Sequence, residues 1–167
     1  PMNALIGMLE LASKSAEQGV TDRVAIEVAS NAAQHLLELI GDILDISRIE
    51  SGHLTLVPER TNLRLLVTSL SAVFEGLARQ KNLEWQVELD VHCQRDVLID
   101  PMRFKQVLSN LLSNAIKFTH AGYIRLRLRV VPGNIAGHVA VKVLIEDSGI
   151  GISATDQQRL FSPFVQA

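Results

Sequence analysis

The N-terminal part of the chain has the hydrophobic spacing of two amphipathic helices. Apolar residues recur every three or four positions across residues 2–12 and again across residues 28–49, a period that places them on one face of a helix. Gly19 ends the first pattern, and Ser51-Gly52 ends the second. Because a two-helix hairpin cannot bury both apolar stripes alone, we predict that a second copy of the chain completes a four-helix bundle, which makes the protein a homodimer.

The rest of the chain switches between strand-like alternation and helical spacing. Residues 123–131 and 138–145 alternate apolar and polar side chains around a Pro-Gly-Asn turn, which predicts a strand pair. Further elements are expected as strands at residues 54–57, 85–89 and 97–99 and as helices at residues 61–81, from Pro101 onward and after Ser153. This order predicts an α+β fold, in which a helical hairpin at residues 1–52 precedes a two-layer α/β sandwich at residues 53–167.

Composition and charge narrow the class of protein. The chain has 167 residues, 47% of them hydrophobic, and a net charge of −2, which is ordinary for a globular protein and argues against nucleic-acid binding. Arg125, Arg127 and Arg129 alternate with apolar residues, so we interpret them as the solvated face of a half-buried strand. No apolar run is long enough to span a bilayer, and we expect no direct membrane contact. The single cysteine, Cys93, excludes an intrachain disulfide.

The first candidate site lies on the helix that precedes the strand pair. Asp100 and Pro101 suit the start of this helix, as its cap and its first-turn residue. Asn110 and Asn114 are one turn apart on one face, and Lys117 flanks the same face. Amide oxygens are hard ligands of the kind that Mg²⁺ accepts beside phosphate oxygens, and a lysine suits a triphosphate. By itself, such spacing is more often a solvated polar stripe.

The second candidate site is the segment 147–152, Asp-Ser-Gly-Ile-Gly-Ile, at the end of the strand pair. Its glycines permit tight turns and close approach of the backbone to a ligand. The Asp147 carboxylate can accept a hydrogen bond from a ligand amino group. By itself, the segment also fits an ordinary turn at the end of a strand, where Asp, Ser and Gly are common.

Together, in this order and with a strand pair between them, the two segments resemble the nucleotide site of the histidine kinase/gyrase/Hsp90 ATPase superfamily. Residues 2–7 are similar to the stretch after the phosphoacceptor box of sensor histidine kinases, and residues 36–52 are similar to their second dimerisation helix. The chain most resembles the hybrid virulence-sensor type. ATP-hydrolysing members of the superfamily carry a glutamate at the position of Asn110, which cannot act as a general base. This difference favours phosphoryl transfer over hydrolysis.

The resemblance implies a role for each matching residue. Asn114 is then the main Mg²⁺ ligand with Asn110 as its partner, Lys117 contacts the ATP phosphates, and Asp147 binds the adenine amino group. Gly149, Gly151 and Ile152 shape the pocket, and Phe161 and Phe164 resemble the phenylalanine box before a mobile ATP lid. The nucleotide site predicted in this way comprises Asn110, Asn114, Lys117, Asp147, Gly149, Gly151, Ile152, Phe161 and Phe164.

The resemblance also implies a function, the core of a two-component sensor histidine kinase that uses ATP and Mg²⁺. The intact protein would phosphorylate one of its own histidines and pass the phosphoryl group to an aspartate of a response-regulator receiver domain. In this family the phosphorylated histidine lies before Pro1, and the lid and a second glycine box lie after Ala167. We therefore expect a fragment, inactive alone, from the cytoplasmic segment of an inner-membrane bacterial sensor.

Two alternatives remain open from the sequence. One is an ATP-gated conformational ATPase of the gyrase or Hsp90 kind. The other is a non-catalytic dimerisation scaffold that keeps the fold.

Overall fold

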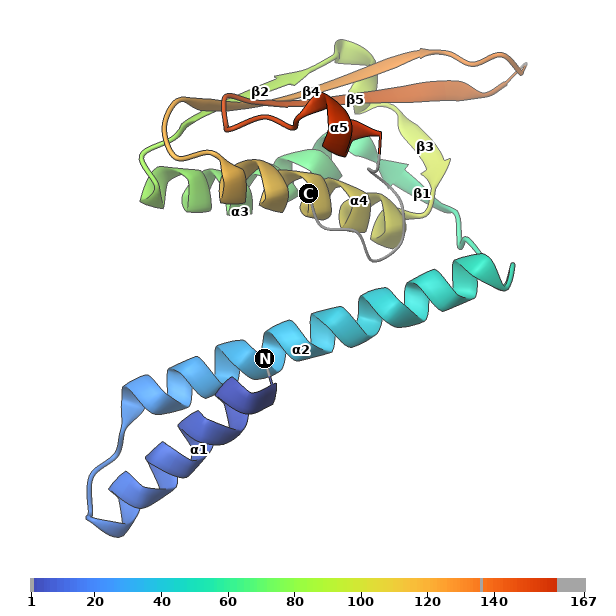
Figure 1. Ribbon diagram of the computed structural model, residues 1–167. Helices are drawn as coiled ribbons and strands as arrows, with labels where there is room; N and C mark the ends of the chain where they lie inside the picture. Colours follow the sequence, from blue (N-terminus) through green and yellow to red (C-terminus); the bar gives the residue numbers. More distant parts are fainter. Residues whose placement is uncertain (1, 136, 159–167) are drawn as a thin grey trace. The chain divides into compact units, whose positions relative to one another are not determined.

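The computed structural model describes residues 2–135 and 137–158, and the chain divides into two compact units, Pro1–Thr55 and Leu56–Ala167 (Figure 1). The first unit is a hairpin of two helices, α1 (Met2–Glu17) and α2 (Arg23–Glu50), which pack against each other. The side chain of Asp22 caps α2 by accepting a hydrogen bond from the Ala25 amide at 2.9 Å. The two predicted N-terminal helices are therefore confirmed.

The second unit has two layers. A sheet with strand order β2 (Glu84–Leu89), β4 (Tyr123–Pro132) and β5 (Val139–Asp147) is covered on one face by α3 (Leu63–Gln80) and α4 (Pro101–Phe118) (Figure 1). Strand β2 runs parallel to β4, and β5 runs antiparallel to it. The predicted α+β fold, a helical hairpin followed by an α/β sandwich, is confirmed.

The core of this unit lies between the sheet and its two helices. The inward side chains of β4, Ile124, Leu126 and Leu128, are fully buried. They form one apolar cluster with buried residues such as Val67 of α3 and Leu112 of α4. Alternation along β4 thus puts one set of residues in the core and the other on the outer face.

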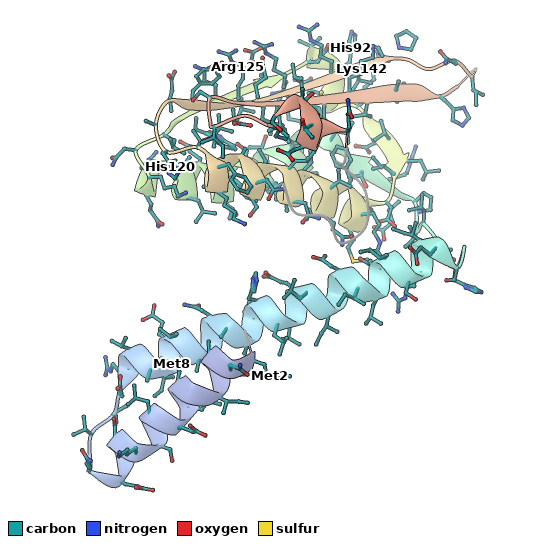
Figure 2. All side chains as sticks on the ribbon, in the orientation of Figure 1. Met2, Met8, His92, His120, Arg125 and Lys142 are labelled. Atoms are coloured by element: carbon teal, nitrogen blue, oxygen red, sulfur yellow. The ribbon has the colours of Figure 1, made fainter. Side chains whose placement is uncertain are left out.

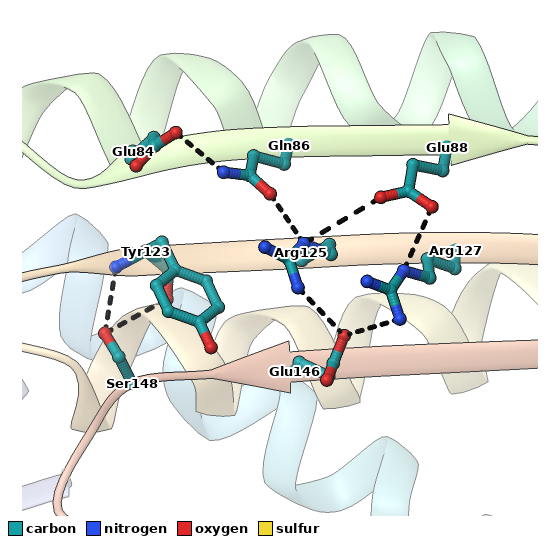
Figure 3. Close-up of polar contacts among 8 residues, drawn as sticks. All are labelled: Glu84, Gln86, Glu88, Tyr123, Arg125, Arg127, Glu146 and Ser148. Atoms are coloured by element: carbon teal, nitrogen blue, oxygen red, sulfur yellow. Dashed lines mark hydrogen bonds and ion pairs between the residues drawn. The ribbon is translucent and has the colours of Figure 1, made fainter.

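The outer face of the sheet carries the arginines that the sequence placed on a solvated strand face. Arg127 pairs with Glu88 at 3.0 Å and with Glu146 at 3.2 Å, and Arg125 pairs with Glu146 at 3.5 Å (Figure 3). Figure 2 shows Arg125 on the side of the sheet away from the helices. Arg125 and Arg127 are only partly exposed, because acidic side chains of β2 and β5 lie beside them.

A smaller sheet pairs β1 (Glu59–Asn62) antiparallel with β3 (Asp96–Ile99), and a short 3₁₀ helix (Val91–Gln94) connects β2 to β3. The predicted strand at residues 54–57 is wrong, because these residues belong to no strand. The Val57 amide donates instead to the side chain of Asp100, at 3.0 Å. The last described helix, α5 (Ala154–Gln157), begins after Ser153 as predicted. No helix in the described part of the chain combines the length and apolarity needed to cross a membrane.

Asp100 holds the start of α4. Its Oδ1 accepts a hydrogen bond from the Arg103 amide at 3.0 Å, while its Oδ2 accepts the Val57 amide. These backbone hydrogen bonds, the one from Arg103 being the largest contribution, lower the pKa of the Asp100 carboxyl below its usual value. The carboxylate therefore joins the chain before β1 to the helix that bears both candidate asparagines.

We expect Asp100 to contribute to the acid sensitivity of the fold. Its folded-state pKa is lowered, so its stabilising effect is complete above the ordinary carboxyl pKa of about 4 and is lost as pH falls through the lower folded-state value. Asp100→Asn should lower the urea midpoint at neutral pH and reduce its further decrease on acidification. Glu59→Gln, at an exposed position on β1, is the control and should follow the wild type. An Asp100→Asn curve parallel to that of the wild type at every pH would contradict this prediction.

Candidate functional site

Helix α4 separates an apolar face from a polar one. Leu108, Leu112, Ala115 and Ile116 are buried against the sheet and α3, whereas Asn110, Asn114 and Lys117 are exposed. In the described part of the chain, neither asparagine side chain is hydrogen-bonded to another residue. Both amide oxygens are thus available to a ligand or to a metal ion.

The C-terminal end of α4 is held by a lysine for which no sequence motif predicted a role. Lys81, the residue after α3, donates from Nζ to the Ile116 carbonyl oxygen at 2.7 Å. A cation at this end of a helix pairs with carbonyls that lack a partner inside the helix. Next along the chain, the Lys117 ammonium lies 5.0 Å from the centroid of the Phe118 ring. Lys81 is thus a support for the polar end of α4, and only its position after a helix marks it in the sequence.

The turn that follows β5 packs on this same end of α4. Asp147 is the last residue of β5, and its Oδ1 accepts a hydrogen bond from the Gly149 amide at 2.9 Å. The Ile150 amide reaches the Phe118 carbonyl oxygen at 3.4 Å. The fold therefore brings the end of the asparagine helix and the Asp-Ser-Gly turn together, although β4 and β5 separate them in the sequence.

A serine inside the turn ties it to the start of β4. Ser148 Oγ accepts a hydrogen bond from the Tyr123 amide at 2.8 Å (Figure 3). The same hydroxyl donates to the Ala121 carbonyl oxygen at 3.2 Å. Gly122 has a φ of +107°, and a Cβ there would overlap the Ser148 hydroxyl. The sequence predicted no individual role for Ser148 or for Gly122. The glycine immediately before a strand was the available signal.

In the described part of the chain, the remaining predicted site residues make no hydrogen bond with the end of α4. Gly151 has a φ of +69°, in the region that favours glycine, and Ile152 is about half exposed. Phe161 and Phe164 lie outside the described residues. The roles of all predicted site residues in ligand binding stay predictions.

The oxygen atoms that α4 exposes are of a kind that can coordinate the Mg²⁺ of a magnesium nucleotide. No group of three or more His, Cys, Asp and Glu side chains in the described part of the chain is arranged to hold a metal ion. The amide oxygens of Asn110 and Asn114 are exposed and remain the predicted ligands. Such neutral oxygens suit Mg²⁺ that takes its other ligands from phosphates and water.

Gly149→Ala is expected to disturb the turn. A Cβ at this position would lie 2.6 Å from the Phe118 carbonyl oxygen and 2.8 Å from Asp147 Oδ1, so the turn must move away from α4. We expect a loss of about 1–3 kcal/mol in the free energy of unfolding, the usual cost of overpacking, measured by urea denaturation. Gly76→Ala on α3, where a Cβ meets nothing within 4 Å, should instead gain about 0.5–1 kcal/mol. Equal free energies of unfolding for Gly149→Ala and the wild type would contradict this prediction, because they would mean that the turn can move away from α4 without loss of stability.

Two family models match the chain and define its class. The model described as the His Kinase A (phospho-acceptor) domain matches residues 1–52, and the model described as the Histidine kinase-, DNA gyrase B-, and HSP90-like ATPase matches residues 99–167. The chain therefore belongs to the histidine kinases, which agrees with the motifs and the fold.

Its relatives include sensor proteins. The virulence sensor protein BvgS of Bordetella pertussis is 52% identical over 99% of this chain, which spans 13% of BvgS. Full-length ShkA in complex with AMPPNP matches 99% of this chain and 34% of its own, with a TM-score of 0.73 and 26% identity. ThkA in complex with the response regulator protein TrrA matches 99% of this chain and 47% of its own, with a TM-score of 0.64 and 25% identity. The chain thus spans less than half of each of these relatives.

Proposed function

We propose that this chain is the dimerisation and nucleotide-binding core of a sensor histidine kinase. In the intact protein it would use Mg-ATP to phosphorylate a histidine and would pass the phosphoryl group to an aspartate of a response regulator. The observation that carries this proposal is the contact between the polar end of α4 and the turn after Asp147. The fold places an exposed asparagine pair and a lysine on the helix that this turn contacts. The AMPPNP complex of ShkA supports a nucleotide as the ligand.

Each side chain has a distinct task in this proposal. The amide oxygens of Asn110 and Asn114 would hold Mg²⁺, which neutralises phosphate charge when it is bound. The Lys117 ammonium would orient the phosphates. Asp147 would read the adenine amino group through Oδ2, because its Oδ1 already accepts the Gly149 amide.

The proposed reaction is transfer rather than hydrolysis because of the residue at position 110. An asparagine amide takes no proton from water, so Asn110 cannot generate a hydroxide nucleophile. A site that binds and orients a nucleotide without activating water leaves the γ-phosphoryl group for a nucleophile that the protein presents. A histidine side chain is such a nucleophile.

We also propose that residues 1–52 form a dimerisation unit and residues 53–167 a nucleotide-binding unit. The helical hairpin fully buries only Ala25 and Ala29 among its described residues. Large apolar side chains along both helices, including Ile6, Leu9, Ile40 and Ile43, are about half exposed. A second hairpin would bury them in a four-helix bundle.

The complex of ThkA with the response regulator TrrA supports a receiver domain as the partner. We further propose that the chain is part of the cytoplasmic segment of a membrane sensor, in line with its sensor relatives.

The test is the chemistry of the product. The intact protein is incubated with Mg²⁺ and ATP labelled at the γ-phosphate, and the stability of protein-bound label is measured in acid and in base. Acid-labile, base-stable label is expected, because phosphohistidine has this stability. Steady release of phosphate without label would favour the conformational ATPase, and neither signal would favour the scaffold. The 167-residue chain alone is expected to incorporate no label.

A further inference from the structure

Thr119 is a buried polar residue to which the proposed site assigns no task. It is the C-cap residue immediately after α4, and its side chain is fully buried. Its backbone amide donates to the Ala115 carbonyl oxygen at 3.1 Å, but its hydroxyl Oγ1 has no hydrogen-bond partner in the described part of the chain. Buried hydroxyls almost always have a partner, because leaving one unpaired is unfavourable.

The residues around Thr119 tie it to the turn after β5. On one side, the Phe118 carbonyl oxygen accepts the Ile150 amide, and on the other the Ala121 carbonyl oxygen accepts the Ser148 hydroxyl. Thr119 therefore lies in the short segment after α4 that is hydrogen-bonded to the turn on both sides of this residue. The unpaired hydroxyl is buried where the two halves of the proposed site meet.

Strand register places Asp147 on the face of the sheet that the helices cover. Asp147 pairs with Ile124, which is fully buried on the face that the helices cover. Residues paired across a ladder lie on the same face, so Asp147 belongs to the helix-covered face, where α4 packs against β5. Asp147 is exposed at the end of that face, whereas the Thr119 side chain is fully buried.

We propose that Thr119 is a positioning residue for the adenine end of the nucleotide site. Its hydroxyl gains a hydrogen bond when the turn at residues 147–150 closes around a bound adenine, and this bond holds Asp147 toward the exocyclic amino group. The inference deepens the proposed function and rests on it. The hydroxyl has no hydrogen bond in the ligand-free state and gains one when the nucleotide binds. The ligand-free state is therefore disfavoured relative to the bound state, which raises the affinity for the nucleotide.

Thr119→Val separates this role from simple packing, because valine has nearly the same shape and lacks the hydroxyl. A packing role predicts unchanged nucleotide binding. A positioning role predicts that the ligand-free protein keeps or gains thermal stability, since an unpaired buried hydroxyl has been removed. It also predicts that binding of adenine nucleotides weakens. Thr119→Ser keeps the hydroxyl and is the matched control.

The experiment measures the Mg²⁺-dependent affinity of the intact protein for ADP and for inosine diphosphate, which lacks the amino group. We expect Thr119→Val to bind ADP about tenfold more weakly, the effect of one hydrogen bond, and to bind inosine diphosphate as the wild type does. Thr119→Ser should stay within about twofold of the wild type for both ligands. If valine prevents folding, Thr119→Ala provides the same comparison, since it also lacks the hydroxyl.

The outcomes distinguish this inference from the proposed function. Asp147→Asn should remove the preference for ADP whether or not Thr119 takes part. A wild-type protein without ADP affinity would overturn the proposed function and the inference with it. A wild-type protein that prefers ADP, together with Thr119→Val that prefers it equally, would overturn the role of Thr119 alone.

Discussion

Asn114→Ala is expected to lower Mg²⁺-dependent nucleotide affinity at least about a hundredfold, since loss of a residue that only supports a metal ligand already costs about 10- to 100-fold. Asn114 is exposed on α4 and makes no side-chain hydrogen bond within the described residues. Alanine removes the amide oxygen and has a higher helix propensity than asparagine. The variant should therefore lose the ligand while its thermal stability is unchanged or slightly higher.

Titration calorimetry of the intact protein with ADP, in the presence of Mg²⁺ and of a chelator, is the measurement. Ser113→Ala is the matched control, because Ser113 is exposed one residue earlier on the same helix and is not among the predicted ligand residues. The control should bind like the wild type. Asn114→Ala with normal affinity and a normal Mg²⁺ requirement would show that the asparagine pair is an ordinary solvated stripe.

Leu112→Ala is expected to cause the largest loss of stability among these variants. Leu112 is fully buried on the opposite side of α4 from Asn114, inside the apolar cluster that α3, α4 and the sheet share. Truncating a buried leucine removes apolar contact and leaves a cavity, which together cost about 2–5 kcal/mol. Urea denaturation followed by circular dichroism measures the free energy of unfolding.

The neighbouring Leu111 provides the control for this prediction. Its side chain is 45% exposed, so Leu111→Ala should change the free energy of unfolding by well under half as much as Leu112→Ala, since less apolar area leaves water on folding. Equal losses at the two positions would mean that α4 presents a different face to the sheet.

The secondary structure was largely predictable because local signals agreed with the fold. Asp100 and Pro101 began α4 as expected, with Asp100 as its cap. Alternation predicted β4 and β5, whose inward residues do form the core. The strand at residues 54–57 failed because the Val57 amide is bonded to the Asp100 side chain, 43 residues away. A local apolar pattern carries no information about such a partner.

The candidate site was predictable in its parts but not in its assembly. Each motif was visible in the sequence, and each also fitted ordinary structure by itself. Their proximity rests on the hydrogen bond between Ile150 and Phe118 and on the close packing of Gly149 against that carbonyl group. The support from Lys81 and the ties from Ser148 come from residues that no motif marks.

The sequence by itself determined the class of fold, the polar face of α4 and the types of side chain available for a nucleotide. These features depend on periodicity and on side-chain chemistry, which are local properties of the chain. Only the tertiary structure decided that the two motifs meet and that Arg125 and Arg127 are paired with Glu88 and Glu146. It also decided that the Thr119 hydroxyl is buried with no hydrogen-bond partner among the described residues. These features depend on strand register and on the packing of α4 against β5, which join residues that are distant in the sequence.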